Sequence, residues 1–207
     1  MPFLLSLSRR IDGFNEFIGR WVAWLVLAAV LISAVNASAR KAFSLTSNAF
    51  LEVQWYLFAA VFLLASGYTL LRQEHVKIDV VLGRFSRRSQ VKVEIFGFLF
   101  FLLPFVVTVV VLVGPLVFKA IATGEMSSNA GGLIRWPVYT LVPAGFTLLG
   151  LQAVSELIKR IAFLQGIGPD PADKGKERTP EEELAEVIRL RAEADAAAAA
   201  RVAGGAR

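Results

Sequence analysis

The chain has 207 residues, of which 56% are hydrophobic, and a formal net charge of +5. It has no cysteine and one histidine, His75, which excludes disulfides, thiolate metal sites, cysteine nucleophiles, histidine metal clusters and a bis-histidine haem. Soluble domains average about 45–50% apolar residues, and the excess here lies in uncharged blocks. The composition therefore indicates a membrane protein without a cofactor, whose positive charge faces a membrane surface and not nucleic acid.

The first twenty residues have the pattern of an amphipathic helix. Four apolar residues recur at helical spacing: Leu7, Ile11, Phe14 and Ile18. Charged residues such as Arg9, Asp12 and Glu16 lie off that stripe. This pattern predicts a lead-in helix over residues 1–20 that lies in the membrane interface. A plain helical continuation of the following span is the alternative.

Four uncharged runs are long enough to cross a bilayer. A helix rises 1.5 Å per residue and the hydrocarbon core is about 30 Å thick, so a span needs about 20 mostly apolar residues. The runs are residues 21–39, 53–71, 95–118 and 136–155. The first run ends in Ala37-Ser38-Ala39, which resembles a signal-peptide cleavage site, but it is longer than the roughly 7–15 apolar residues of a signal peptide. We therefore expect it to be a retained span.

Lysine and arginine are distributed unequally around these four runs. Eleven lie before the first run, between the second and third, or just after the fourth: Arg9, Arg10, Arg20, Arg72, Lys77, Arg84, Arg87, Arg88, Lys92, Lys159 and Arg160. Four lie on the opposite side: Arg40, Lys41, Lys119 and Arg135. Because basic residues favour the cytoplasmic side, the sequence predicts a multi-pass protein of the bacterial inner (plasma) membrane with both termini in the cytoplasm.

Two further helices are expected outside the spans. Ile78, Val81, Leu82 and Phe85 follow helical spacing, so a second interfacial helix is predicted over residues 75–85. In the tail, Thr179 and Pro180 have the pattern of a helix start. The predicted fold is an all-α integral membrane protein in three parts: an amphipathic lead-in over residues 1–20, a four-helix membrane domain over 21–165, and a cytoplasmic, partly helical tail over 166–207.

Few polar residues near the spans could carry chemistry. Glu52 is an acid at the outer boundary of the second span, where it could form a proton or cation site. A structural role, with solvation or pairing to a base such as Arg135, is favoured. His75 and Asp79 lie four residues apart beside the membrane surface, which is typical of hydrogen-bonded surface groups. Since the spans contain no ionisable relay, the pattern favours a packing element that accompanies another protein.

Three stretches, in this order, point to a family. They are NAFLEVQWYLF at residues 48–58, GYTLLRQEHVKID at 67–79 and SSNAGGLIRWP at 127–137. Together with the four-span plan, they resemble the small membrane (Q-type) subunit of tripartite ATP-independent periplasmic (TRAP) transporters. The resemblance covers about residues 10–165 and does not extend to the alanine-rich tail.

This resemblance implies a small permease subunit that scaffolds a larger, multi-spanning TRAP permease subunit in the lipid bilayer. A periplasmic solute-binding protein would deliver an organic acid for ion-coupled uptake. The residues that match the family are expected to orient helices and subunit contacts: Glu52, Trp55, His75, Asp79, Arg135 and Trp136. The alternatives are an independent small secondary transporter with Glu52 as its coupling carboxylate, or a membrane-anchor subunit of another complex.

Overall fold

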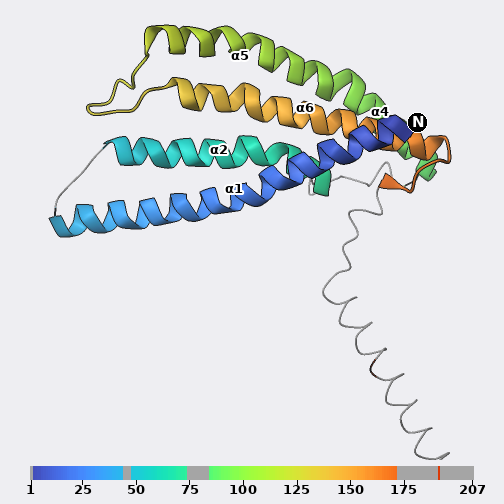
Figure 1. The fold of residues 1–207 in the computed structure, drawn as a ribbon, viewed down its shortest axis with the longest axis horizontal. Helices are drawn as coiled ribbons and strands as arrows, with labels where there is room; N and C mark the ends of the chain where they lie inside the picture. The colour runs from blue at the N-terminus through green and yellow to red at the C-terminus, as the bar shows by residue number, and fades with distance from the viewer. Residues whose placement is uncertain (1, 44–47, 74–83, 172–190, 192–207) are drawn as a thin grey trace, which may run out of the picture. The chain divides into compact units, whose positions relative to one another are not determined.

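The computed structural model describes residues 2–43, 48–73, 84–171 and 191. Its helices are α1 (Pro2–Phe43), α2 (Asn48–Arg72), α4 (Arg87–Gly97), the π-helix η1 (Phe98–Leu102), α5 (Leu103–Thr123) and α6 (Trp136–Leu164) (Figure 1). The segments α4, η1 and α5 follow one another without a break. Residues Met1–Pro171 form one compact unit.

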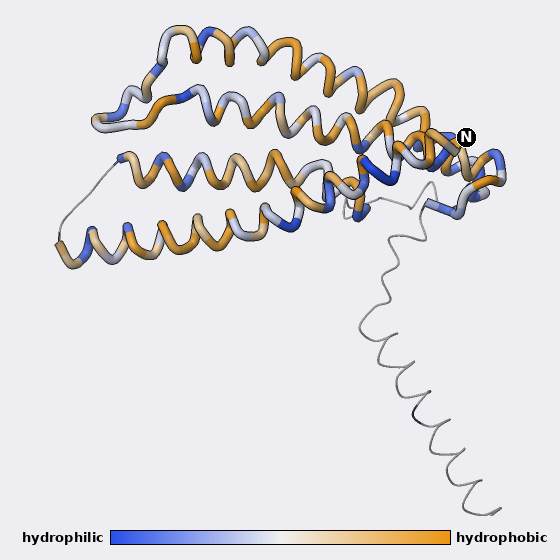
Figure 2. Tube along the Cα trace, viewed as in Figure 1, coloured by the Kyte–Doolittle hydropathy of each residue, from blue (hydrophilic) through white to orange (hydrophobic). Residues whose placement is uncertain are grey.

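Four helical rods are long and apolar enough to cross a membrane, as the sequence predicted: α1, α2, the α4–η1–α5 rod and α6. Each predicted span lies inside one of these rods. Figure 2 shows apolar residues along the middle of the rods and hydrophilic residues gathered toward their ends. The all-α membrane fold is therefore confirmed.

The rods form a layer in the order α1, α2, α6 and α5 (Figure 1). Helix α6 is the most enclosed, with 33% of its most apolar window buried, against 6% in the α4–η1–α5 rod. The start of α1 also crosses onto α6. We call the end with the start of α1, the end of α2, α4 and the end of α6 the basic end. The opposite end, with Phe43, Asn48, Thr123 and Trp136, is the loop end.

Helices α2 and α6 approach closely because small residues line their contact. A Cβ atom on Gly145 would lie 2.6 Å from the backbone oxygen of Leu63. The hydroxyl of Ser66 donates to the carbonyls of Leu63 at 2.7 Å and Gly145 at 3.3 Å. Within lipid, helices associate through close packing and hydrogen bonds and not through a hydrophobic drive. The α2–α6 contact follows that rule.

The π-helix η1 has a local cause in the sequence. Pro104 has no backbone N–H and its ring crowds the preceding turn, so the regular hydrogen-bond ladder cannot continue through it. The N–H of Leu103 instead donates to the carbonyl of Phe98, five residues earlier. A single wide turn of this kind accommodates the proline.

The lead-in segment is helical, but it is a continuation of the first span, and its polar side faces inward. Ser8 and Asn15 are 1% and 0% exposed, whereas Leu7 and Phe14 are 39% and 52% exposed. The predicted helix over residues 75–85 lies almost entirely outside the described residues, and so does the predicted tail helix after Thr179.

Candidate functional site

The carboxylate of Glu52, 4% exposed, lies at the loop end against the segment between α5 and α6. Its Oε1 accepts hydrogen bonds from the Ser127 hydroxyl and, at 2.8 Å, from the Asn129 amide. Its Oε2 accepts from the backbone N–H of Leu133 at 2.6 Å. A Cβ on Gly132 would lie 2.9 Å from the same carboxylate, so the loop needs glycine there. Glu52 thus holds the loop on both sides of its turn.

Two more residues of α2 bind the same loop. The amide of Asn48 donates to the carbonyl of Ala130 at 3.0 Å, and the hydroxyl of Tyr56 donates to the carbonyl of Ile134 at 3.0 Å. Asn48, Glu52 and Tyr56 are four residues apart and therefore share one side of the helix. That side of α2 is a platform for the loop.

Pairing of Glu52 with Arg135 was one of two options expected from the sequence; the described structure instead has an ion pair between Arg135 and Glu125. The loop is a narrow hairpin in which the N–H of Arg135 donates to the carbonyl of Glu125 at 2.9 Å. This places the two side chains opposite each other, with Nη1 of Arg135 3.4 Å from Oε1 of Glu125. A hydrogen bond to the hydroxyl of Tyr139, at 3.3 Å, raises the pKa of Arg135 further, so the guanidinium stays charged.

The remaining residues from the sequence prediction do not join this cluster. Trp55 and Trp136 are 65% and 39% exposed at the loop end, as suits amphipathic rings at a membrane interface. His75 and Asp79 lie outside the described residues. Of the six residues predicted from the sequence, Glu52 and Arg135 thus contact the same loop, through different partners.

A second polar cluster, which sequence reasoning missed, joins α1 to α6 at the basic end. Asp12 accepts hydrogen bonds from the Ser155 hydroxyl at 2.6 Å and the Gln152 amide at 2.9 Å, and it pairs with Lys159 at 3.2 Å. The amide of Asn15 donates to the side-chain oxygen of Gln152 at 2.9 Å. The signal in the sequence was the inward-facing polar stripe Ser8, Asp12 and Asn15, which recurs at helical spacing.

The cluster continues through buried charges to α4. Glu156, 1% exposed, pairs with both Lys159 and Arg160. Arg160, 2% exposed, also donates to Glu94 at 2.7 Å. Buried charges are tolerated only when they are paired and hydrogen-bonded, and these meet that condition.

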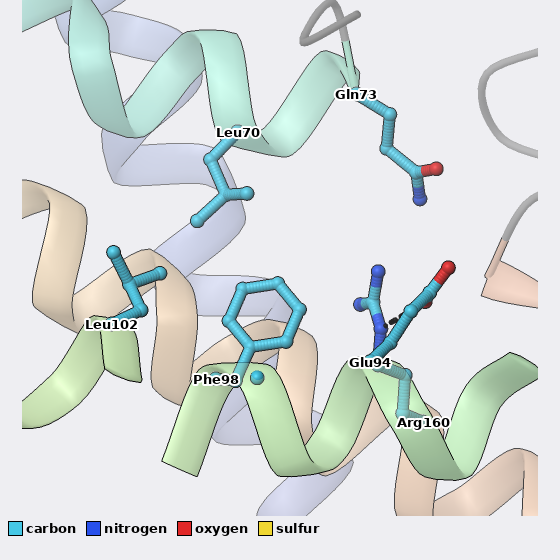
Figure 3. Close-up of a pocket in the computed structure, with 7 residues that line it drawn as sticks. Leu70, Gln73, Glu94, Phe98, Leu102 and Arg160 are labelled. Atoms are coloured by element: carbon cyan, nitrogen blue, oxygen red, sulfur yellow. Dashed lines mark hydrogen bonds and ion pairs between the residues drawn. The ribbon is translucent and has the colours of Figure 1, made fainter. Parts of the chain in front are cut away.

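A cavity of about 220 Å³ adjoins Arg160 (Figure 3). Leu70, Phe98 and Leu102 supply its apolar walls. At its margin Arg160 and Glu94 bond to each other, and the guanidinium lies 4.7 Å from the centre of the Phe98 ring. These polar groups are already paired, and no group of three metal-ligating side chains occurs within the described ranges. The two charged groups at the cavity are therefore engaged within the chain.

Comparison with known proteins identifies the family. The family model described as "Tripartite ATP-independent periplasmic transporters, DctQ component" matches residues 29–163. The chain belongs to the DctQ family. No curated protein and no solved structure matches the chain. Family membership and the four membrane-crossing rods identify a small permease subunit of a TRAP transporter, which is a multi-pass inner-membrane protein.

Proposed function

We propose that this DctQ chain is a static scaffold of its transporter. In this proposal the large permease subunit binds and moves the organic acid and its coupling ion, and the DctQ chain holds that subunit in the membrane. The observation that carries the proposal is the location of the charges. The described acids lie at the two ends of the bundle, and each is held by hydrogen bonds or ion pairs within the chain.

An independent transporter would need a different distribution of charge. Ionisable residues inside membrane spans mark ion pathways and proton relays. Residues 21–39, 53–71, 95–118 and 136–155 contain no Asp, Glu, Lys, Arg or His. Glu52, the coupling carboxylate of the alternative hypothesis, has both oxygens engaged by loop donors. A bundle without charged residues in its spans is suited to holding a partner subunit in the membrane and not to carrying an ion.

The arrangement of the rods agrees with a partner in the membrane. Helix α5 packs on α6 at one edge of the layer and leaves large apolar side chains uncovered. Phe105, Val111, Leu112 and Phe118 are 56–75% exposed. Such a face is stable beside lipid or another apolar membrane protein. It gives a large permease subunit room to bind without a change within the DctQ bundle.

The loop end supplies the candidate contact residues. With both termini cytoplasmic, Glu52, Trp55, Arg135 and Trp136 would face the periplasmic side, where the solute-binding protein arrives. Glu52 would fix the shape of the loop, and the half-exposed Arg135 would contact a partner. By the family resemblance, His75 and Asp79 would orient contacts on the cytoplasmic side.

Affinity purification tests this proposal. A tagged chain, extracted from its native membranes in mild detergent, should recover a large multi-spanning permease subunit in stoichiometric amount. Arg135→Ala should reduce recovery of that subunit or docking of the binding protein, without changing which substrate is taken up. Arg40→Ala, at an exposed base of the same end, is the control. The scaffold proposal would be contradicted if the chain purified alone. It would also be contradicted if Arg135→Ala changed which substrate the complex takes up.

A further inference from the structure

At the basic end, the described acids are all paired with bases, whereas several other bases are exposed and unpaired with any described acid. All five described acids there have basic partners: Asp12 with Lys159, Glu16 with Arg72, Glu94 and Glu156 with Arg160, and Asp170 with Arg87. Six exposed bases have no acidic partner in the part of the chain that the structure describes: Arg9, Arg10, Arg20, Arg84, Arg88 and Lys92. Among the described residues, the internal pairs account for the acids and leave a surplus of positive charge on the surface.

Helix α4 has both kinds of base within three turns: one that is paired with an acid and two that are exposed. On its inner side, Arg87 binds both carboxylate oxygens of Asp170, at 2.7 and 2.6 Å. On its outer side, Arg88 and Lys92 are exposed and four residues apart, which places their side chains one above the other, about 5–6 Å apart at Cβ. Two cations at this spacing can both reach one phosphate group.

The same side of the rod becomes apolar as it enters the predicted span. Phe96 follows Lys92 by one turn and is 53% exposed; Phe100, in η1, is 60% exposed. Their ring centres are 4.7 Å apart. The sequence of groups along the rod is therefore two cations followed by two adjoining aromatic rings, tilted by 32° to each other. A phospholipid has the same order, with an anionic headgroup followed by acyl chains.

We propose that Arg88, Lys92, Phe96 and Phe100 form a binding surface for an anionic phospholipid. The two cations contact the headgroup phosphate, and the acyl chains lie along the two phenylalanine rings. Charge complementarity selects the headgroup, since no acid of the described chain neutralises these bases. The apolar rings directly below them favour a lipid over a soluble anion. This surface does not depend on the scaffold proposal.

Lipid retention by the purified full chain tests the surface. The chain is reconstituted in nanodiscs that contain equal amounts of phosphatidylglycerol and phosphatidylcholine. It is then released from the nanodiscs, and native mass spectrometry measures the mass of the chain with its bound lipids. Each base near a membrane surface contributes about 1 kcal/mol of attraction to anionic lipid. The double variant Arg88→Gln/Lys92→Gln should therefore lower the ratio of retained phosphatidylglycerol to phosphatidylcholine roughly 30-fold.

The matched control is Lys41→Gln/Lys119→Gln, which removes the same charge at the loop end and should leave the ratio unchanged. Circular dichroism of each variant checks that the helices are retained. Three results would overturn the proposal. They are a wild-type chain without preference for phosphatidylglycerol, an equal loss in the control, and a double variant that keeps the wild-type lipid ratio.

Discussion

Glu52 is a membrane-boundary carboxylate, and both of its oxygens accept hydrogen bonds from one loop. Replacing it with alanine would leave the N–H of Leu133 and the side chains of Ser127 and Asn129 without their acceptor. Donors that lose their acceptor in a packed contact destabilise the folded state. We predict that Glu52→Ala lowers the thermal unfolding midpoint and speeds amide hydrogen exchange in residues 127–133.

Glu125→Ala is the control for that experiment. Glu125 and Arg135 have side chains 35% and 34% exposed, and exposed ion pairs contribute little to stability. The effect of Glu125→Ala on stability and exchange should therefore be smaller. Unchanged exchange at Leu133 in Glu52→Ala would show that the carboxylate does not hold the loop.

At the scale of elements, the contact between α2 and α6 depends on Gly145. A methyl group there would meet the backbone oxygen of Leu63, which cannot move without moving α2. Gly114, inside α5, has open space around its Cβ position, and alanine in a helix interior is favoured over glycine by roughly 0.5–1 kcal/mol. We predict that Gly145→Ala lowers the thermal midpoint in detergent and that Gly114→Ala does not. A shift of the same size in both variants would contradict this packing.

The positions of the spans were predictable from the sequence, but their partners were not. A run without charge over about 20 residues is a requirement of the bilayer thickness, so it can be read along the chain. Asp12 and Lys159 are 147 residues apart, and their contact depends on how α1 crosses α6. The same reason explains why the sequence offers Arg135 as a candidate partner for Glu52. The actual partner of Arg135, Glu125, follows from the hairpin shape of the loop.

The compact unit ends at Pro171, beyond residue 166, where the predicted tail begins. The amide of Gln73 donates to the carbonyl of Pro171 at 2.7 Å, and Asp170 binds Arg87. We predict that truncation after Pro171 leaves uptake by the full complex near wild type, because the removed residues have little apolar surface to bury. Truncation after Gly168 should lower the thermal midpoint, since it removes Asp170. Equal midpoints for the two truncations would show that these contacts do not stabilise the bundle.

For the whole molecule, the cysteine-free chain allows a direct topology test. Single cysteines at Ser44 and Ser128 should react with an impermeant thiol reagent added to intact cells, whereas cysteines at Ser86 and Ala172 should not. Ser128 is preferred to Ser127, because the Ser127 hydroxyl donates to Glu52. The predicted labelling pattern follows from the unequal distribution of lysine and arginine, which places both termini in the cytoplasm. Labelling at Ser86→Cys in intact cells would contradict the predicted orientation.

The scaffold proposal assigns transport to the partner and stability of the assembly to the DctQ chain. Its most direct test is uptake of a labelled organic acid, in the presence of the binding protein and an inward gradient of sodium or of protons, by three sets of proteoliposomes. These contain the DctQ chain alone, the large permease subunit alone, or both. The account predicts uptake only with both subunits. The spans of the DctQ chain contain no ionisable site, and the large permease subunit needs the DctQ chain to hold it in the membrane. Ion-driven uptake by either subunit alone would contradict it.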